Sequence, residues 1–157
     1  MADPILLPGT VDDAPEVLVL QRCCWVAEAI SNDTLDIPPL HEDLEAVRSW
    51  AGTAWLLRDG PRLIGGVRAA ADGGTWRIGR LMVAPDRQGE GLGRRLLAHA
   101  EAAAPPVVDR FALFTGRRST RNLALYERAG YRRVGQDAAV VHLEKARPGG
   151  AEAGRVH

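Results

Sequence analysis

The segment VAPDRQGEGLGR, residues 83–94, decides the fold of this chain. Its order is typical of a strand end, a short turn, a glycine-rich loop and then a helix. Glycines at positions 89, 91 and 93 let backbone N–H groups point into one concavity without side chains in the way. The helix that follows adds its positive dipole end and its unpaired N–H donors. The segment therefore predicts a phosphate or pyrophosphate site, with Arg87, Arg94 and Arg95 at its rim.

Two common phosphate-binding loops do not match this segment. Its spacing is not G-x-G-x-x-G, because position 94 is arginine, so the dinucleotide fingerprint fails. It has no G-K-[ST], so the Walker loop fails as well. The preceding strand also belongs to an antiparallel meander, whereas a Rossmann site needs a parallel unit. At this point a tight turn whose glycines only serve helix–sheet packing remains an alternative.

The patterning of the whole chain indicates one mixed α/β domain over residues 1–146. A tail without apolar periodicity follows over 147–157, and we expect it to be disordered. The expected strands cover residues 4–10, 53–58, 62–70, 75–83, 110–115, 131–134 and 138–145. The expected helices run from Asp12 or Asp13 to a breaker-rich loop at 31–39, and over 41–51, 91–104 and 119–129. Because the central strands follow one another through short turns, we expect a largely antiparallel sheet flanked by helices.

Composition excludes several classes of function. The chain has 157 residues, of which 20 are basic and 20 acidic, so its formal net charge is zero. That balance argues against an electrostatic nucleic-acid binder. No apolar run approaches the roughly 18 residues of a membrane span, and the N-terminus lacks the features of a signal peptide. We expect a cytoplasmic protein without a metal site, in which Cys23 and Cys24 are packing residues.

Two motifs together resemble the GNAT acyltransferase superfamily. QGEGLG (residues 88–93) matches its [RQ]-x-x-G-x-[GA] loop, directly after RLMVAP (80–85), which is similar to its fourth strand and exit proline. NLALYERAGY (122–131) is similar to its second signature, a helix ending in Y-E-x-x-G-[FY]. The motifs lie in the expected order, and the resemblance covers roughly residues 4–145. It implies the mixed α/β GNAT fold, with a largely antiparallel central sheet.

The resemblance also implies an enzyme, an acyl-CoA-dependent N-acyltransferase. It would move an acetyl group from acetyl-CoA to a primary amine of a small molecule, peptide or protein by direct attack. The cofactor would enter where strands 76–83 and 110–115 splay apart. Its pantetheine arm would pair with the backbone of Leu81, Met82 and Val83. Its pyrophosphate would be held by Gln88, Gly89, Glu90, Gly91, Leu92, Gly93 and Arg94.

Tyr126 matches the family tyrosine that faces the departing sulfur. A phenol held there can protonate the thiolate leaving group. A backbone N–H of Met82 or Val83 would serve as the oxyanion contact. Many members carry asparagine seven residues before this tyrosine, where this chain has Ser119, which is also the expected cap of its helix. Asn122 stands four residues before it, so either Ser119 or Asn122 could touch the cofactor.

The sequence does not indicate a general base or an acceptor. Neither 75–83 nor 110–115 contains an acidic residue, although several relatives keep a base there. A surface position is the favoured interpretation of five groups in the variable region, Glu28, Asp33, Asp36, His41 and Glu42. Arg68, Arg77 and Arg80 lie on expected strands, and any of them that faced the groove would favour an acceptor with a carboxylate. The alternation of side chains along these strands does not show which face each arginine occupies. For each of the three, a surface position is again the favoured interpretation.

Two alternatives keep the fold and change the function. The missing carboxylates suggest a catalytically inactive acyl-CoA sensor or interaction module, although the retained Tyr126 argues against it. An acyltransferase that uses another acyl-CoA, such as succinyl-CoA, keeps the chemistry with a different donor. A homodimer is also consistent with the resemblance, while no residue indicates a partner surface.

Overall fold

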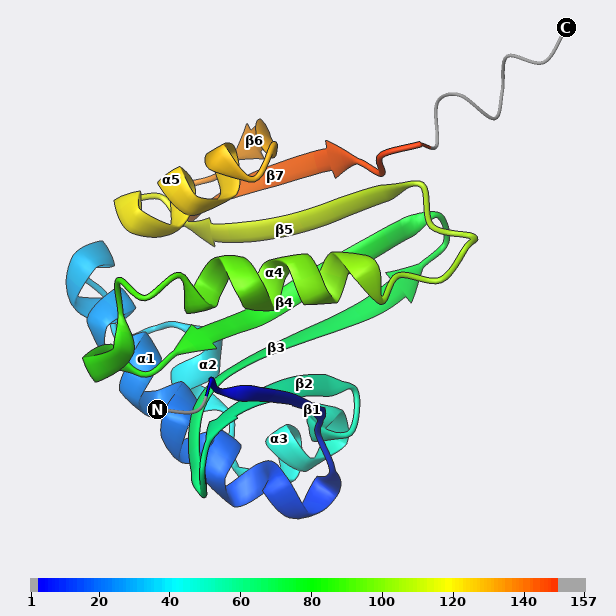
Figure 1. Cartoon of the computed structure of the whole chain (residues 1–157). Helices are drawn as coiled ribbons and strands as arrows, with labels where there is room; N and C mark the ends of the chain where they lie inside the picture. The colour runs from blue at the N-terminus through cyan, green and yellow to red at the C-terminus, as the bar shows by residue number, and fades with distance from the viewer. Residues whose placement is uncertain (1–2, 150–157) are drawn as a thin grey trace, which may run out of the picture.

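A computed structural model describes residues 3–149 as one seven-stranded sheet flanked by helices (Figure 1). The strand order is β1-β2-β3-β4-β5-β7-β6, and every neighbouring pair is antiparallel except β4 with β5. The largely antiparallel sheet predicted from the sequence is therefore confirmed. The strands are β1 (Ile5–Pro8), β2 (Ala54–Asp59), β3 (Arg62–Asp72), β4 (Thr75–Val83), β5 (Arg110–Gly116), β6 (Arg132–Gln136) and β7 (Val140–Ala146).

Helices cover both faces of the sheet. They are α1 (Ala14–Asn32), α2 (Pro38–His41), α3 (Leu44–Ala51), α4 (Leu92–Ala102) and α5 (Thr120–Arg128), with 3₁₀ turns η1 (Val11–Asp13) and η2 (Pro85–Arg87). Figure 1 shows α4 in front of the sheet and α1 and α3 behind it. The indole N–H of Trp76 donates to a carbonyl of α4 at 2.8 Å, whereas Arg68 stacks on Trp50 of α3. None of the described helices is long and apolar enough to cross a membrane.

The segment between α1 and α3 differs from the prediction. A short helix, α2, interrupts the loop expected over 31–39, because Ile37 keeps an extended backbone before two prolines that start a helical turn. His41 ends α2, so it does not open the next helix. The N-cap of α3 is Asp43, whose carboxylate accepts from the N–H of Ala46 at 2.9 Å. Glu42 lies in the junction between these two helices, where it turns toward the sheet.

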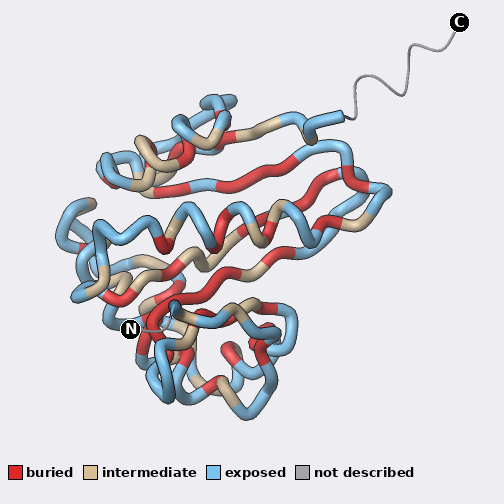
Figure 2. Tube along the Cα trace, viewed as in Figure 1, coloured by how far each residue is buried: buried red, intermediate tan, exposed pale blue. Residues whose placement is uncertain are grey.

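Buried residues lie along the central strands and at intervals along α4 (Figure 2), and most of them are apolar. Phe111, Leu56 and Ile64 are among the largest side chains that lie almost completely buried. Leu96 of α4 and Val17 of α1 are fully buried as well, one helix from each face. Each such side chain stabilises the fold by roughly 1.5–3 kcal/mol relative to an exposed position. The two helical layers are therefore fixed against one rigid sheet.

The chain end beyond the last strand is partly anchored. Arg147, at the start of the tail that we expected to be disordered, donates to the carbonyls of Pro105 at 2.6 Å and Val108 at 3.0 Å. This side chain therefore ties the end of β7 to the turn between α4 and β5. Residues 150–157, the rest of the predicted tail, lie outside the described residues.

Strands β4 and β5 pair only at one end and then diverge. Their parallel register covers just Thr75–Arg77 against Arg110–Ala112. Beyond it β5 stays paired with β7 as far as Gly116, and β4 stays with β3 as far as Val83. Figure 1 shows the two strands moving apart in this direction. The second half of β4 thus has no strand partner on its β5 side among residues 3–149.

The diverging halves of β4 and β5 leave a wedge-shaped opening between them, and helix α1 spans its wide end. Near the end of β4, the Cys24 thiol donates to the Val83 carbonyl, with 3.3 Å between sulfur and oxygen. Beyond β5, the Asn32 amide donates to Ser119 Oγ at 3.1 Å and accepts from the N–H of Arg118 at 2.9 Å. Cys24 and Asn32 are eight residues apart, or about 12 Å along a helix. Paired strands are only about 4.8 Å apart, so α1 holds the two strand ends well separated.

A bulge in β4 changes which face its side chains occupy. Gly66 lies opposite Met82 and Arg68 opposite Gly79, so β4 has one residue more than β3 over this interval. Arg80 takes up the extra residue in a left-handed conformation, with φ +50°. Regular alternation would place Arg80 on the opposite face from Arg77, since they are three residues apart. The bulge instead turns Arg80 toward α1 and α2.

Gly116 is a site where a single methyl group tests the bridge. A Cβ there would lie 2.6 Å from the side-chain amide of Asn32, which three hydrogen bonds hold in place. We expect Gly116→Ala to lower the free energy of unfolding by about 1–3 kcal/mol, measured by urea denaturation. Gly52→Ala is the matched control, because nothing lies within 4 Å of the new Cβ. Equal stability of the two variants would contradict the bridge.

Candidate active site

The glycine-rich loop has the order that the sequence predicts. After β4 and η2, Gly89 and Gly91 have φ +83° and +77°, the left-handed region that favours glycine, and α4 begins at Leu92. Nothing lies within 4 Å of a Cβ placed on either glycine. The loop is therefore open on the side where its backbone curves, at the N-terminus of an 11-residue helix. This geometry suits an anion held by backbone N–H groups.

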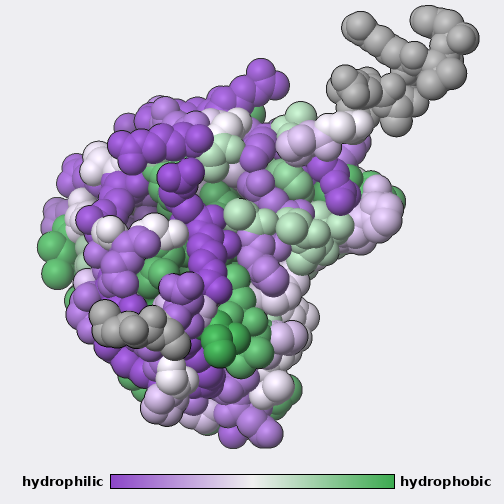
Figure 3. Space-filling view, viewed as in Figure 1, coloured by the Kyte–Doolittle hydropathy of each residue, from purple (hydrophilic) through white to green (hydrophobic). Residues whose placement is uncertain are grey.

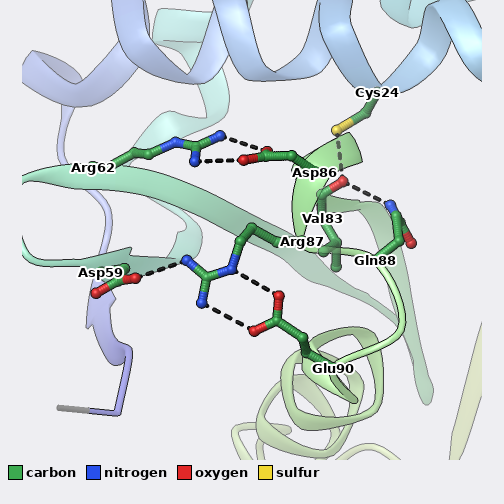
Figure 4. A network of polar contacts seen from close by, with 8 residues as sticks. All are labelled: Cys24, Asp59, Arg62, Val83, Asp86, Arg87, Gln88 and Glu90. Carbon is green, nitrogen blue, oxygen red and sulfur yellow. Dashed lines mark hydrogen bonds and ion pairs between the residues drawn. The ribbon is translucent and has the colours of Figure 1, made fainter. Parts of the chain in front are cut away.

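The charged side chains of this loop are arranged differently from the prediction (Figure 4). Arg87 donates to Glu90 at 2.8 Å and to Asp59 at 2.7 Å, so its charge is already compensated by two carboxylates. Its hydrogen bond to Glu90 lowers the pKa of that carboxyl. Arg94 and Arg95 form no ion pair within residues 3–149, and hydrophilic side chains gather over this part of the surface (Figure 3). Of the three arginines predicted for the rim, Arg94 and Arg95 are therefore the two whose charges no carboxylate within residues 3–149 compensates.

The carbonyl of Val83 already has two donors. Besides the Cys24 thiol, the side-chain amide of Gln88 donates to it at 2.9 Å (Figure 4). A carbonyl oxygen has two lone pairs, so its acceptor capacity is filled. A pantetheine N–H that pairs with the Val83 carbonyl must therefore replace either Gln88 or the Cys24 thiol. Leu81, one of the other two predicted backbone partners, lies in the unpaired half of β4 and lines the cavity described below.

Cys24 is an inert thiol in this structure. Burial raises its pKa to about 12, and its S–H is engaged by Val83. The expectation of a packing residue is confirmed for Cys24, which packs against the core, and is wrong for Cys23, which is exposed. A thiol with so high a pKa is a poor nucleophile at neutral pH. Burial therefore keeps the Cys24 thiol protonated at neutral pH.

The two cysteines should separate in a thiol titration. At pH 8 we expect a disulfide reagent to modify Cys23 at least about tenfold faster than Cys24 in the folded protein, because only Cys23 is exposed. Both thiols should react at similar rates once the protein is unfolded in denaturant. Peptide mass spectrometry identifies the modified residue. Equal rates in the folded protein would contradict the buried position of Cys24.

A cavity of about 1070 Å³ opens on the α1 side of the wedge. It brings together Tyr126 and Asn122, both predicted from the family motif, with side chains of α1, α3, β3 and β4. The predicted pyrophosphate residues 88–94 do not line it; they form the separate loop at the start of α4. Within residues 3–149 no group of three or more His, Cys, Asp and Glu side chains is placed to hold a metal ion.

Tyr126 lies at the α5 end of the cavity. It is 6% exposed, and its ring packs edge-on against Tyr131 with 6.1 Å between ring centroids. Burial raises its pKa, and the negative charge of Glu28 raises it further. Its hydroxyl makes no hydrogen bond to any of residues 3–149, and the residue lines the cavity. Tyr126 is thus a protonated phenol with a free proton to donate.

Glu28 is a cavity residue, so its assignment to the surface is wrong. One carboxylate oxygen accepts from Ser119 Oγ, and the other accepts from Asn122 Nδ2 at 3.3 Å. Ser119 stands at the N-cap position of α5, but its side chain makes no cap hydrogen bond because it is turned to Glu28. The spacing of four between Cys24, Glu28 and Asn32 gives one helix face, the signal that could have identified Glu28.

Glu42 is also turned inward, contrary to the prediction. It accepts from Arg80 Nε at 2.9 Å and from the indole N–H of Trp50 at 3.0 Å. Burial acts to raise the pKa of Glu42, but these hydrogen bonds outweigh it, so the pKa lies below its ordinary value. The strand arginines in question, Arg68, Arg77 and Arg80, all line the cavity. The remaining three predicted surface residues are exposed as expected, Asp33, Asp36 and His41.

The model of the acetyltransferase (GNAT) family matches residues 15–131, which is most of the chain. The chain therefore belongs to the GNAT acetyltransferase family, as its two motifs and its sheet with a diverging parallel pair indicate. The family indicates an acyl-CoA N-acyltransferase. A search of curated proteins gives no significant match.

Solved structures of this family have the same fold. PaiA N-acetyltransferase from Thermoplasma acidophilum, in complex with coenzyme A, is 14% identical, with a TM-score of 0.74 over 92% of this chain and 99% of that one. An acetyltransferase from Thermus thermophilus is 22% identical, with a TM-score of 0.71 over 92% and 97%. N-acetylglutamate synthase from Neisseria gonorrhoeae, complexed with coenzyme A and N-acetyl-glutamate, is 18% identical, with a TM-score of 0.73 over 94% of this chain and 36% of that one.

Proposed function

We propose that this protein transfers an acetyl group from acetyl-CoA to a primary amine by direct attack. The observation that carries the proposal is the meeting of Tyr126 and Glu28 in one cavity at the open end of β4 and β5. A proton donor for sulfur and a proton acceptor for nitrogen are the two groups that aminolysis of a thioester needs. In a chain of the GNAT family, this pair supports an active enzyme.

The residues present fit an acyl-CoA. Gly89 and Gly91 leave open space beside the backbone, and the N-terminus of α4 favours a pyrophosphate there. The unpaired edge of β4 suits the extended pantetheine arm, which would run into the wedge toward the cavity. Two structural relatives were solved with coenzyme A bound, which supports an acyl-CoA as the ligand. The bound cofactor supplies the acyl thioester; the groups proposed to hold it are Leu81, Met82, Val83, Gln88, Gly89, Glu90, Gly91, Leu92, Gly93, Arg94 and Asn122.

The side chains of the cavity then divide the proton transfers between them. Overall, an ammonium and a thioester become an amide, a thiol and one released proton: a C–N bond forms and the C–S bond breaks. Of the two protons that nitrogen loses, Glu28 accepts one, directly or through water, and passes it to solvent. Tyr126 donates its phenol proton to the departing sulfur, and the second proton lost by nitrogen restores the phenol. Ser119 and Asn122 fix the Glu28 carboxylate, and an N–H of Met82 or Val83 faces the developing oxyanion.

The structure also bears on the inactive-sensor alternative. That alternative depends on the lack of acidic residues in β4 and β5, and Glu28 from α1 fills the gap. The positively charged cavity lining does not distinguish acetyl-CoA from other acyl-CoA donors. We therefore keep acetyl-CoA as the proposed donor and test it against other thioesters in the same assay.

Cofactor binding can be tested with one substitution and a matched control. Gly91→Glu places a side chain and a negative charge where the pyrophosphate should lie. We expect it to weaken acetyl-CoA binding at least about tenfold in calorimetry. Gly73→Glu is the control, since Gly73 has a similar φ of +59°, open space around it and a position in the β3–β4 turn. Unchanged affinity in Gly91→Glu, or equal loss in both variants, would contradict the site.

The role of Tyr126 can be tested through turnover and its pH dependence. We expect Tyr126→Phe to lower kcat by about 10²-fold or more, while the Kd for acetyl-CoA changes less than about twofold. Because its pKa is raised, the phenol stays protonated even at a pH near the ordinary tyrosine pKa of about 10. We therefore expect no fall in kcat up to about pH 10. Full turnover in Tyr126→Phe, or a falling alkaline limb centred below about pH 9, would remove the acid role.

Glu28 can be tested by a near-isosteric change. Glu28→Gln cannot take up a proton, and it keeps one oxygen, which accepts from Ser119 or from Asn122 but not from both. We expect kcat at neutral pH to fall by about 10²-fold, while the free energy of unfolding falls by only about 1 kcal/mol for the lost hydrogen bond. Glu45→Gln on the exposed face of α3 is the control and should leave kcat as it is. Wild-type turnover in Glu28→Gln would show that another group accepts the proton.

A further inference from the structure

Glu28 and Arg68 lie at different ends of the cavity, whose charged lining also includes Asp36, Arg77, Arg80, Arg117 and Arg118. Glu28 lies at the α5 end, where it contacts Ser119 and Asn122 and raises the pKa of Tyr126. Arg68 lies at the α3 end, with its guanidinium carbon 4.9 Å from the centre of the Trp50 ring. Arg80 and Glu42 are the charged groups that act most directly on Arg68.

Arg68 is a half-buried cation without a counter-ion. Within residues 3–149 it makes no ion pair and no side-chain hydrogen bond. Burial lowers its pKa, the nearby charge of Arg80 lowers it further, and Glu42 opposes both. A guanidinium in this setting loses water without gaining a carboxylate, which is costly unless a ligand completes it.

Glu42 does not provide that carboxylate. It pairs with Arg80, whose Nε donates to it at 2.9 Å, it accepts from the Trp50 indole at 3.0 Å, and it makes no ion pair with Arg68. One carboxylate thus faces two guanidinium groups, and one positive charge is left over at the cavity wall. The Arg68 guanidinium lies over the Trp50 ring, and this cation–π contact holds it at the cavity wall. A planar, fixed guanidinium is the donor that a carboxylate binds best, with two parallel hydrogen bonds.

We propose that the acceptor amine carries a carboxylate, which binds Arg68, while its amino group is drawn to Glu28. This assignment rests on the proposed function and names its substrate class, an amino acid or a similar zwitterion. Arg68 is on β3, and Thr115, beside Asn122, is on β5. Two strand spacings separate them, or roughly 10 Å, and more where the strands diverge. The acceptor therefore has several bonds between its amino and carboxylate groups.

A series of ω-amino acids tests both the charge and the span. β-Alanine, 4-aminobutanoate and 6-aminohexanoate are each compared with the corresponding amino amide, which has the same length without the charge. With wild type we expect the KM of at least one acid to be about tenfold or more below that of its amide, with the best length set by the cavity. In Arg68→Gln this ratio should fall to within about twofold, whereas kcat for the amides should hold.

Arg48→Gln is the matched control. Arg48 is on α3 like Trp50, but it lies on the outer surface, pairs with Glu45 and does not line the cavity. It should keep the wild-type preference for the acids. An unchanged preference in Arg68→Gln, or equal KM values for acids and amides with wild type, would overturn the assignment while leaving the acetyltransferase proposal intact.

A binding measurement separates the two proposals. The same acids and amides are titrated into the protein saturated with coenzyme A, followed by calorimetry. Tighter binding of the acids that is lost in Arg68→Gln supports the carboxylate site, whether or not any amine is acetylated. A lack of acetylation across the whole series would count only against the proposed function. Equal Kd values for acids and amides would overturn the carboxylate site whatever the turnover.

Discussion

The rest of the structure depends on the short pairing between β4 and β5. The two strands share a register over only Thr75–Arg77 and then separate, and the end of α1 spans the distance between them. Main-chain groups that would pair within a continuous sheet are thereby left along one edge of β4. An unpaired edge is normally a liability that proteins cover. Here it lies inside the fold, next to a glycine loop at a helix N-terminus, where an extended ligand can complete the sheet.

Helix α1 both separates the ends of β4 and β5 and positions Glu28 in the cavity. Cys24 and Asn32, near the two strand ends, and Glu28 between them occupy successive turns of one face. The same hydrogen bonds that keep the strands apart therefore also place the Glu28 carboxylate beside Tyr126. The negative charge of Glu28 raises the pKa of Tyr126, so the proposed base keeps the proposed acid protonated. This dependence ties the chemistry to the spacing of the strands.

Much of the fold could be predicted from the sequence because its signals are local. Three local features predicted helix and strand positions without tertiary information: the glycines at 89 and 91, the prolines after α4 and the alternation in the central strands. Gly130 is a further example, since its φ of +99° ends α5 as the pattern predicts. Helix α2 was missed because its four residues, PPLH, follow a cluster of residues typical of loops.

The site was harder to predict because its signals are not local. The face of Arg80 depends on a bulge that a non-glycine residue absorbs, and no residue type marks such a place. Glu28 and Ser119 are 91 residues apart, and Glu42 and Arg80 are 38 apart, so only the folded chain brings each pair together. A family motif pointed to Tyr126 and Asn122. It could not point to acidic residues in a segment where the family varies.

Hydrogen exchange followed by mass spectrometry tests the central claim most directly, that the open edge of β4 and the glycine loop form one cofactor site. Amide exchange is compared in the protein alone and with saturating acetyl-CoA. The account predicts slower exchange in peptides covering residues 78–83 and 88–95, with little change in β1 and β2, which lie across the sheet. Protection confined to other segments, or none in residues 78–83 despite bound cofactor, would contradict it.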